Sequence, residues 1–374
     1  MAHRTRWTRL LSGVALAATA ALTAAGCTSA PATSGSGNGS GHASGTAPAV
    51  TAAEAAQAFH HAVTAYVAAS TGADATADLS FTTGVARVEL STGMQTARYF
   101  DVHVPATALT LGDPVFYLPE AAGYPQWFVA NVGITYNIPA LPANGGQWVG
   151  APGGIQWENV DGHSVFLFTK ASATAPWQLA SISKLAPGVS VPALAVDGDG
   201  HVPNVSGSDT ALLAQPDVTG PLQASVADEG PASPASKLVA SGPLTTGIYD
   251  NERAHLLGLT APRGDVLQWE LEGSNYRQFA FRTADGGALV FYAMYLNTSV
   301  QTPASLNLSR PLNPGPAISV SQLLAPLLGR GHPTPRVKLE GQQLLSFAAV
   351  DPPANGGKVE VIAIGGDWSY ASAS

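Results

Sequence analysis

Two short patterns in the chain contain side chains that could do chemistry. Ser181 and Lys184 have the S-x-x-K spacing in which a serine acts as nucleophile and a lysine as its base. Asp197 and Asp199 alternate with glycine, as carboxylate ligands do at the start of a calcium loop. No Lys-Thr-Gly accompanies the first pattern, and no closing glutamate follows the second. We therefore expect Ser181 to lie in a structural strand and the Asp197 segment to form a turn.

The sequence offers only weak candidates for a metal ligand or a general base. His60 and His61 are neighbours on a predicted helix, where successive side chains point about 100° apart and do not bind one ion together. Asp101, beside two aromatic residues, is the nearest candidate for a carboxylate base, and we expect it on the outer face of a strand. The chain has no G-x-S-x-G, H-E-x-x-H, G-x-G-x-x-G or phosphate-loop motif. The sequence predicts no catalytic residue, no metal site and no cofactor, which favours a protein that is not an enzyme.

The single cysteine, Cys27, follows an N-terminal segment built like an export signal. A basic lead of three arginines precedes an apolar run from Leu10 to Leu22, and small residues follow the run. The run is shorter than the roughly 20 residues that cross a bilayer as a helix. It therefore predicts a cleaved signal and not a permanent anchor.

This segment resembles the signal of bacterial lipoproteins, in which the thiol of a cysteine takes a diacylglycerol before cleavage makes that cysteine the N-terminus. The resemblance implies a signal peptide at residues 1–26 and lipidation of Cys27, with acyl chains such as palmitate. It also implies a location on the outer face of the cytoplasmic membrane. Ala24 departs from the pattern, because that family usually has leucine there. The alternative is an ordinary secretory signal, which would leave an unpaired thiol exposed to oxidation.

Composition limits the partners of the chain after the signal. Three of the 17 Lys and Arg but none of the 25 Asp and Glu precede Cys27, so the remaining chain has a net charge of −11. Phosphates repel such a surface, which argues against nucleic acid as a partner. Residues 27–50 are mostly Ser, Gly, Thr and Ala, and they predict a disordered tether. Without a second cysteine, no intramolecular disulfide can stabilise the fold.

A first α+β domain is predicted at residues 51–205. Thr51 and Glu54 form a capping-box pattern ahead of apolar residues at helical spacing, which predicts a helix over 52–69. From residue 86 onward, short apolar runs alternate with turn residues, which predicts strands. These strands are expected at 86–90, 99–104, 115–117, 127–132 and 177–185, with a hairpin at 157–168.

A second α+β domain is predicted at residues 236–374, after an irregular linker at 206–235. Helices are expected at 249–259 and 320–328. Strands are expected at 266–271, 276–282, 288–296, 337–339, 344–350 and 359–364. The order of elements repeats that of the first domain, with a helix first and antiparallel strands after it.

Two residue matches support a duplication. Tyr124-Pro-Gln-Trp127 resembles Tyr276-Arg-Gln-Phe279, and an Asp-Gly pair precedes an apolar strand in each half. Modules of this size, with a helix and then a curved sheet, look like the nuclear transport factor 2-like cone fold. That resemblance implies two cone-like domains, each with one or more helices packed on a curved antiparallel sheet. The whole chain is also similar to uncharacterised lipoproteins of high-GC Gram-positive bacteria, including their Ala, Gly and Thr bias.

Aromatic residues between 133 and 157 predict a ligand-binding loop. Tyr136, Trp148 and Trp157 lie among many Gly and Pro residues, which favours a loop over a core strand. Exposed rings on such a loop could stack on sugars or fill a groove of a partner protein. The alternative is that the rings fold back and cover the open end of the sheet.

Together these features predict a lipid-anchored, extracytoplasmic protein with a non-catalytic binding role in the cell envelope. Its ligand would be a small molecule, a wall polymer or another protein, and its contact with the membrane would run through Cys27. One alternative is a cone-fold enzyme of the isomerase or hydrolase type that uses a pocket carboxylate. Another is a structural factor in envelope assembly.

Overall fold

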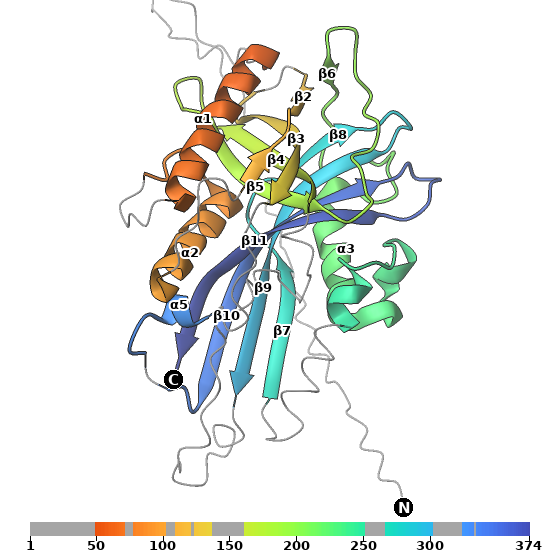
Figure 1. Ribbon diagram of the computed structural model, residues 1–374. Helices are drawn as coiled ribbons and strands as arrows, with labels where there is room; N and C mark the ends of the chain where they lie inside the picture. Colours follow the sequence, from red (N-terminus) through yellow and green to blue (C-terminus); the bar gives the residue numbers. More distant parts are fainter. Residues whose placement is uncertain are drawn as a thin grey trace, which may run out of the picture. The chain divides into compact units, whose positions relative to one another are not determined.

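The computed structural model describes residues 49–71, 78–101, 109–120, 123–136, 161–250, 266–301, 324–332 and 334–374 (Figure 1). Its helices are α1 (Ala52–Thr71), α2 (Gly84–Phe100), α3 (Pro216–Glu229) and the short α5 (Ala325–Leu328), with 3-10 helices η2 (Gly230–Ala232) and η3 (Pro234–Lys237). The strands are β1 (Leu109–Leu111), β2 (Val115–Pro119), β3 (Gln126–Tyr136), β4 (Gly162–Lys170), β5 (Gln178–Leu185), β6 (His201–Val202), β7 (Val266–Gly273), β8 (Phe279–Arg282), β9 (Ala288–Gln301), β10 (Lys338–Asp351) and β11 (Glu360–Ala373).

The described strands join one curved, unclosed α+β sheet in the order β6-β2-β3-β4-β5-β11-β10-β9-β7, with β1 beside β3 and β8 beside β9. Neighbours are antiparallel apart from β2 and β6, which are parallel. The start of β9 pairs with β8, whereas its end pairs with β7. Strands β7 and β8 are therefore two pieces of one edge, interrupted at residues 274–278.

Helix α1 begins where its capping-box pattern predicts, with the N-cap bond of that pattern. The backbone N–H of Glu54 donates to Oγ1 of Thr51 over 3.2 Å. The Glu54 carboxylate also accepts from Nε1 of Trp177 at 2.8 Å and from Nζ of Lys170 at 3.3 Å. These bonds hold the first turn of α1 against β4 and the segment that leads into β5.

Helix α2 corrects the sequence prediction, which placed strands at 86–90 and 99–104. The buried residues Ala86, Leu90 and Met94 recur every four positions, which is helical spacing. Val88 and Gly93 lower helix propensity, but packing of α2 against the sheet stabilises the helix. Asp101 was expected on the outer face of a strand. It is instead the exposed C-cap of α2, in the left-handed conformation with φ of 55°.

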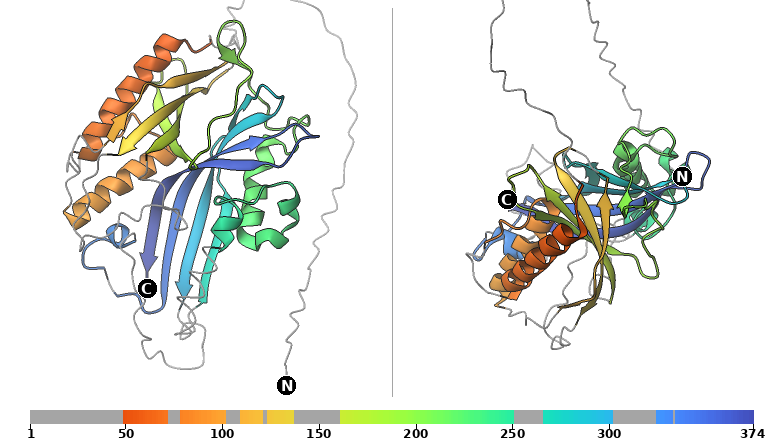
Figure 2. Two further views of the ribbon diagram at one scale, coloured as in Figure 1. Left: turned by 45° about the vertical axis from the view of Figure 1, so that its right-hand side comes forward. Right: turned by 90° about the horizontal axis from the view of Figure 1, so that it is seen from above.

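Helix α1 covers the sheet part made by β2–β5, and α2 lies next to it along β5 and β11 (Figure 2). Phe59 of α1 and Leu90 of α2 are buried there with Phe128 and Phe168, whose rings stack with their centroids 4.6 Å apart. Helix α3 covers a different part of the sheet, formed by β7, β9 and β10. Its packing buries a cluster that includes Val226, Met294 and Phe347.

A third cluster lies between the two halves of the sheet, of which the first contains β1–β6 and the second contains β7–β11. It buries Trp127, Val129 and Leu167 from the first half against aromatic and aliphatic residues of the second half. The ring centroid of Trp127 lies 4.3 Å from that of Phe281 and 5.0 Å from that of Phe279. We call this cluster the shared core, because both halves contribute to it.

The two halves of the sheet are joined by a short ladder between β5 and β11. Only Leu185 with Ala363 and Lys184 with Ile364 are paired in register among the described residues of these strands. Just beyond the ladder, the β11 backbone passes so close to β5 that a Cβ on Gly365 would lie 1.8 Å from the carbonyl oxygen of Ile182. Glycine is therefore required at this crossing.

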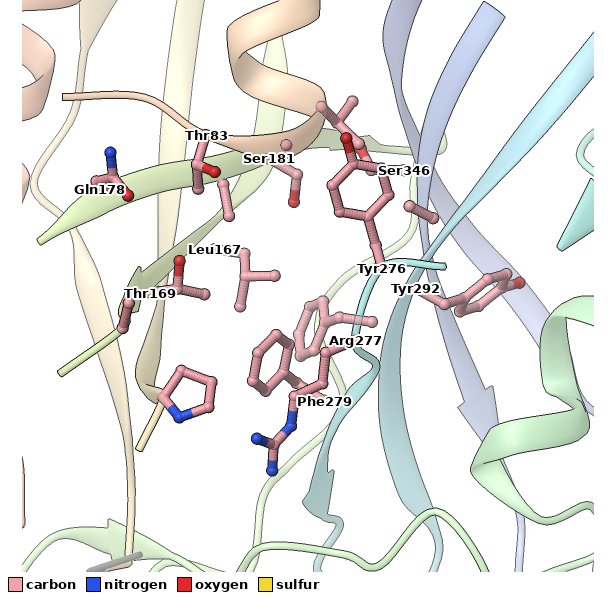
Figure 3. A pocket seen from close by; sticks show the side chains of 17 residues that line it. Thr83, Leu167, Thr169, Gln178, Ser181, Tyr276, Arg277, Phe279, Tyr292 and Ser346 are labelled. Atoms are coloured by element: carbon pink, nitrogen blue, oxygen red, sulfur yellow. The ribbon is translucent and has the colours of Figure 1, made fainter. Parts of the chain in front are cut away.

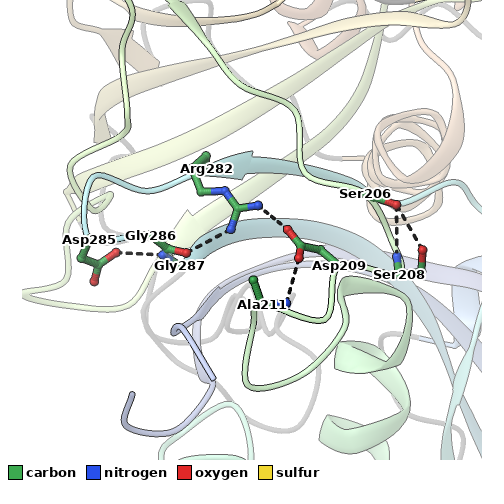
Figure 4. A network of polar contacts seen from close by, with 8 residues as sticks. All are labelled: Ser206, Ser208, Asp209, Ala211, Arg282, Asp285, Gly286 and Gly287. Carbon is green, nitrogen blue, oxygen red and sulfur yellow. Dashed lines mark hydrogen bonds and ion pairs between the residues drawn. The ribbon is translucent and has the colours of Figure 1, made fainter. Parts of the chain in front are cut away.

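The predicted linker at 206–235 is not irregular, because it contains α3, η2 and the start of η3. Ahead of α3 it is bonded to the turns of the second half, as Figure 4 shows for the ion pair between Asp209 and Arg282. Arg282 also donates from Nη1 to the carbonyl oxygen of Gly286 at 3.0 Å. The backbone N–H of Ala214 donates to Oδ1 of Asp351 at 3.1 Å. The segment is thus part of the folded structure.

Most strand predictions are confirmed, with β9 and β11 longer than expected. The two strands predicted at 337–339 and 344–350 form the single strand β10. The predicted helix at 320–328 is confirmed in its last four residues, as α5. Only residues 249–250 of the predicted helix at 249–259 are described, and they are helical. The signal at 1–26 and nearly all of the tether at 27–50 lie outside the described residues. The separate folding of the domains 51–205 and 236–374 stays a prediction.

Candidate functional site

A pocket of about 230 Å³ opens between the two halves of the sheet (Figure 3). The first half contributes the start of α2, β4, β5 and Pro125, and the second half contributes Tyr276, Arg277, Phe279, β9 and β10. Leu167, Phe279 and Phe291 of the shared core form its apolar wall. We call this the inter-half pocket.

The interruption of the edge strand positions the second-half side of the pocket. Oγ of Ser274 donates to the carbonyl oxygen of Ala293 at 2.7 Å and accepts from the backbone N–H of Tyr276 at 3.3 Å. The Ser274 side chain thus bonds the Ala293 carbonyl group of β9 at the place where the edge strand is interrupted. Tyr276 and Arg277 follow directly and line the pocket.

An irregularity in β5 positions the first-half side. Ser181 pairs with Leu167 and Leu179 with Phe168, so Ala180 is an extra residue without a partner in β4. Ala180 and Ser181 consequently both line the pocket, although they are neighbours in the strand. Ser181 is only 7% exposed, and Figure 3 shows its hydroxyl pointing into the pocket.

Helix α2 begins at the same pocket, which Thr83, Gly84 and Val85 line. Thr83 is the N-cap, but its side chain makes no capping hydrogen bond. The helical hydrogen-bond ladder begins with the N–H of Arg87, which donates to the Thr83 carbonyl oxygen at 3.3 Å. The N–H groups of the first turn therefore precede the ladder, as in every α-helix, and no side-chain cap covers them.

The electrostatic character of the pocket differs from that of the whole chain. Arg277 lines it, and no Asp or Glu is among the described residues that do so. The guanidinium carbon of Arg277 lies 5.7 Å from the centroid of the Phe279 ring, and the side chain is exposed at the mouth. Burial raises the pKa of the Tyr276 hydroxyl, with the neighbouring Tyr295 adding to the effect. Tyr276 is therefore neutral at physiological pH.

The two repeated sequence segments meet beside this pocket. Tyr124, Pro125 and Trp127 line a smaller adjoining cavity of about 170 Å³ together with Arg277 and Phe279. The aromatic residues that end the two segments, Trp127 and Phe279, are in contact in the shared core. The two segments that match in the sequence thus lie next to each other in the structure.

Three carboxylates outside the inter-half pocket have raised pKa values. Burial raises the pKa of Asp228 to about 6, that of Asp351 to about 6 and that of Asp367 to about 7. The backbone N–H of Leu271 donates to Asp228 and partly opposes the effect. None of the three lines the inter-half pocket. The carboxylate base that a cone-fold enzyme would require is therefore not among the described residues that line this pocket.

The structure separates Ser181 from Lys184. Both are buried residues of β5, not of a helix start, and in a strand residues three apart point to opposite faces. The S-x-x-K spacing therefore does not form a nucleophile and base pair, as expected. Asp197 forms the expected turn, since its Oδ1 accepts from the backbone N–H groups of Asp199 and His201.

The predicted binding loop lies almost entirely outside the described residues. Trp148 and Trp157 belong to residues 137–160, and Cys27 belongs to the N-terminal part that is not described. Tyr136 ends β3, where it pairs with Leu109. Ligand binding by these three aromatic residues and lipidation of Cys27 stay predictions.

Sequence reasoning missed the inter-half pocket and its residues Tyr276 and Arg277. One signal was present, because Gly273-Ser274-Asn275 is a run of turn residues directly before a predicted strand. The repeated Tyr-x-Gln-aromatic segment marked the same place. Neither signal showed that residues more than 100 positions apart would line one pocket.

Fold and site define an α+β protein with a small ligand-sized pocket between two sheet halves. The chain belongs to the family described as Domain of unknown function (DUF8094), whose model matches residues 46–371. It is 27% identical to an uncharacterized lipoprotein of Streptomyces avermitilis over 81% of this chain and 79% of the relative. It is 30% identical to an uncharacterized lipoprotein of Streptomyces coelicolor over 64% of each chain. No solved structure matches the chain.

These relatives confirm the resemblance to uncharacterised actinobacterial lipoproteins. No helix among the described residues is long and apolar enough to cross a membrane.

Proposed function

We propose that this protein is a lipid-anchored binding protein of the cell envelope that holds a small molecule in the inter-half pocket without catalysis. The pocket carries the proposal, because apolar side chains line it together with a few polar groups, as in small-molecule sites. The lining residues include no Asp, Glu, His, Cys or Lys among those described, so neither a general base nor an activated nucleophile is available there.

Anchoring through Cys27 is supported by the lipoprotein-like signal and by the names of the two Streptomyces relatives. In this proposal the protein sits on the outer face of the cytoplasmic membrane, and residues 28–50 act as a tether. The two halves are modules related by duplication, each comparable to a cone-like domain. The repeated segments that meet beside the pocket support this relationship.

Anchoring is tested with Cys27→Ser. Without a thiol to take the lipid, the folded body has no predicted apolar anchor, so we expect the variant in the medium and the wild type in the membrane fraction. Cell fractionation followed by immunoblotting measures the distribution. Equal membrane retention of the two proteins would contradict the proposed anchor.

Binding is tested by analysing what the protein carries out of its own envelope. We expect mass spectrometry of the denatured, membrane-extracted wild type to detect a small molecule that the variant Ala171→Trp lacks. Ala171 is exposed and lines the pocket, so a tryptophan there can close the mouth without disturbing the core. Identical small-molecule content in the two proteins, with equal melting temperatures, would contradict binding in this pocket.

A further inference from the structure

We infer that the inter-half pocket selects a small carboxylate with an apolar body. The inference rests on the proposed binding function and specifies the ligand class. Four features of the pocket carry it: a buried free hydroxyl, an uncapped helix start, an exposed arginine and an apolar wall without carboxylates.

The hydroxyl of Ser181 is the feature that most directly indicates a ligand. The residue is 7% exposed, and its Oγ has no hydrogen-bond partner among the described residues. The residue is thus mostly enclosed by protein, while its oxygen is left free to bond whatever occupies the pocket. By contrast, the neighbouring Ser183 is satisfied, since its Oγ lies 2.8 Å from Oγ of Ser346. A ligand oxygen would supply the bond that Ser181 lacks.

The charge of the ligand follows from the start of α2 and from Arg277. The positive end of a helix dipole favours an anion, and the Thr83 side chain does not occupy the first-turn N–H groups. Arg277 forms no ion pair with any described carboxylate. One arginine matches one negative charge, which favours a carboxylate over a dianionic phosphate.

The apolar part of the ligand follows from the wall opposite these groups. Leu167, Phe279 and Phe291 line the pocket and belong to the shared core. The volume of about 230 Å³ is small for a ligand site and limits the body to a single ring or a short chain. Arg277 at the mouth and Ser181 inside would then contact the ligand from two sides, as their positions in Figure 3 indicate.

The test compares 4-methylbenzoate with 4-methylbenzamide, which have nearly the same shape but differ in charge. Binding to the exported Cys27→Ser protein is measured by isothermal titration calorimetry and ligand-observed NMR. We expect the carboxylate to bind about tenfold more tightly than the amide. Arg277→Gln should remove most of this preference, whereas Lys237→Gln, the same charge change at an exposed position outside the pocket, should leave it unchanged.

Ser181→Ala should weaken binding of both probes about five- to tenfold, because it removes a donor that either oxygen can use. Equal binding of carboxylate and amide would overturn the ligand class but leave the binding function standing. Absence of binding by both probes, or binding that Ala171→Trp does not reduce, would also overturn the inference. The proposed binding function has its own test. It would be contradicted if the membrane-extracted wild type carried no small molecule that Ala171→Trp lacks.

Discussion

Asp367 shows how burial sets the behaviour of a single residue. Its carboxyl group is surrounded by protein although the residue as a whole is partly exposed, and Oδ1 accepts from the backbone N–H of Trp368 at 2.7 Å. Burial disfavours the charged form and raises the pKa to about 7 from an ordinary value of 3.8. The folded protein therefore keeps a proton there at pH values at which the unfolded chain has lost it.

This difference makes stability depend on pH. Between the two pKa values the folded state binds more protons than the unfolded state, so the free energy of unfolding falls as pH rises. For Asp367 alone we expect a loss of about 2–3 kcal/mol from pH 5 to pH 8, and Asp228 and Asp351 act in the same direction. Urea unfolding at both pH values measures it.

The control for this prediction is the variant Asp367→Asn, which keeps an oxygen for the Trp368 N–H but does not titrate. We expect its stability to fall less than that of the wild type over the same pH range. Asp113→Asn, at an exposed position between β1 and β2, should fall as the wild type does. The same pH slope in Asp367→Asn and wild type would show that the carboxyl is not responsible.

At the scale of elements, the crossing of β5 and β11 depends on close backbone approach. Gly365→Ala would place a Cβ 1.8 Å from the Ile182 carbonyl oxygen, so one strand must shift. We expect a loss of about 2–4 kcal/mol in the free energy of unfolding. Gly357→Ala is the matched control, because nothing lies within 4 Å of its added Cβ, and we expect a change within about 0.5 kcal/mol.

Chemical denaturation of both variants measures this difference. If Gly365→Ala were as stable as Gly357→Ala, the two strands would not approach as closely as described, and the joined sheet would need revision. Helix α2 shows the same dependence on neighbours, since its sequence has weak helix propensity and its buried face packs on the sheet.

At the scale of the whole molecule, the halves have separate cores and also share one. The core beneath α1 and α2 uses residues of the first half, whereas the core beneath α3 uses residues of the second half. The shared core buries Trp127 of the first half against Phe279 and Phe281 of the second. We propose that each half folds as a domain and that the shared core adds stability to the pair.

A fragment of residues 51–205 tests this proposal. We expect it to fold alone, with helical circular dichroism and a cooperative melt, but with a lower melting temperature than the full chain because one face of the shared core is exposed. Circular dichroism during heating measures both properties. A fragment without a cooperative transition would show that the halves form a single folding unit.

The sequence alone determined the features that depend on neighbouring residues. Thr51 and Glu54 begin α1, the Asp285-Gly286 pair makes the turn between β8 and β9, and most strands follow short apolar runs. The resemblance to actinobacterial lipoproteins also rests on local features, namely the export signal with its cysteine and the composition of the chain. Such features are visible because capping, turn geometry and hydrophobic pattern act over a few residues.

Only the tertiary structure decided how distant segments combine. Helix α2, the role of residues 206–235 and the joining of β5 to β11 depend on partners far along the chain. The inter-half pocket joins Ser181 to Tyr276 and Arg277 through a strand irregularity and a broken edge strand. These contacts form because burying the shared core stabilises one relative placement of the halves, and no local pattern in either segment encodes that placement.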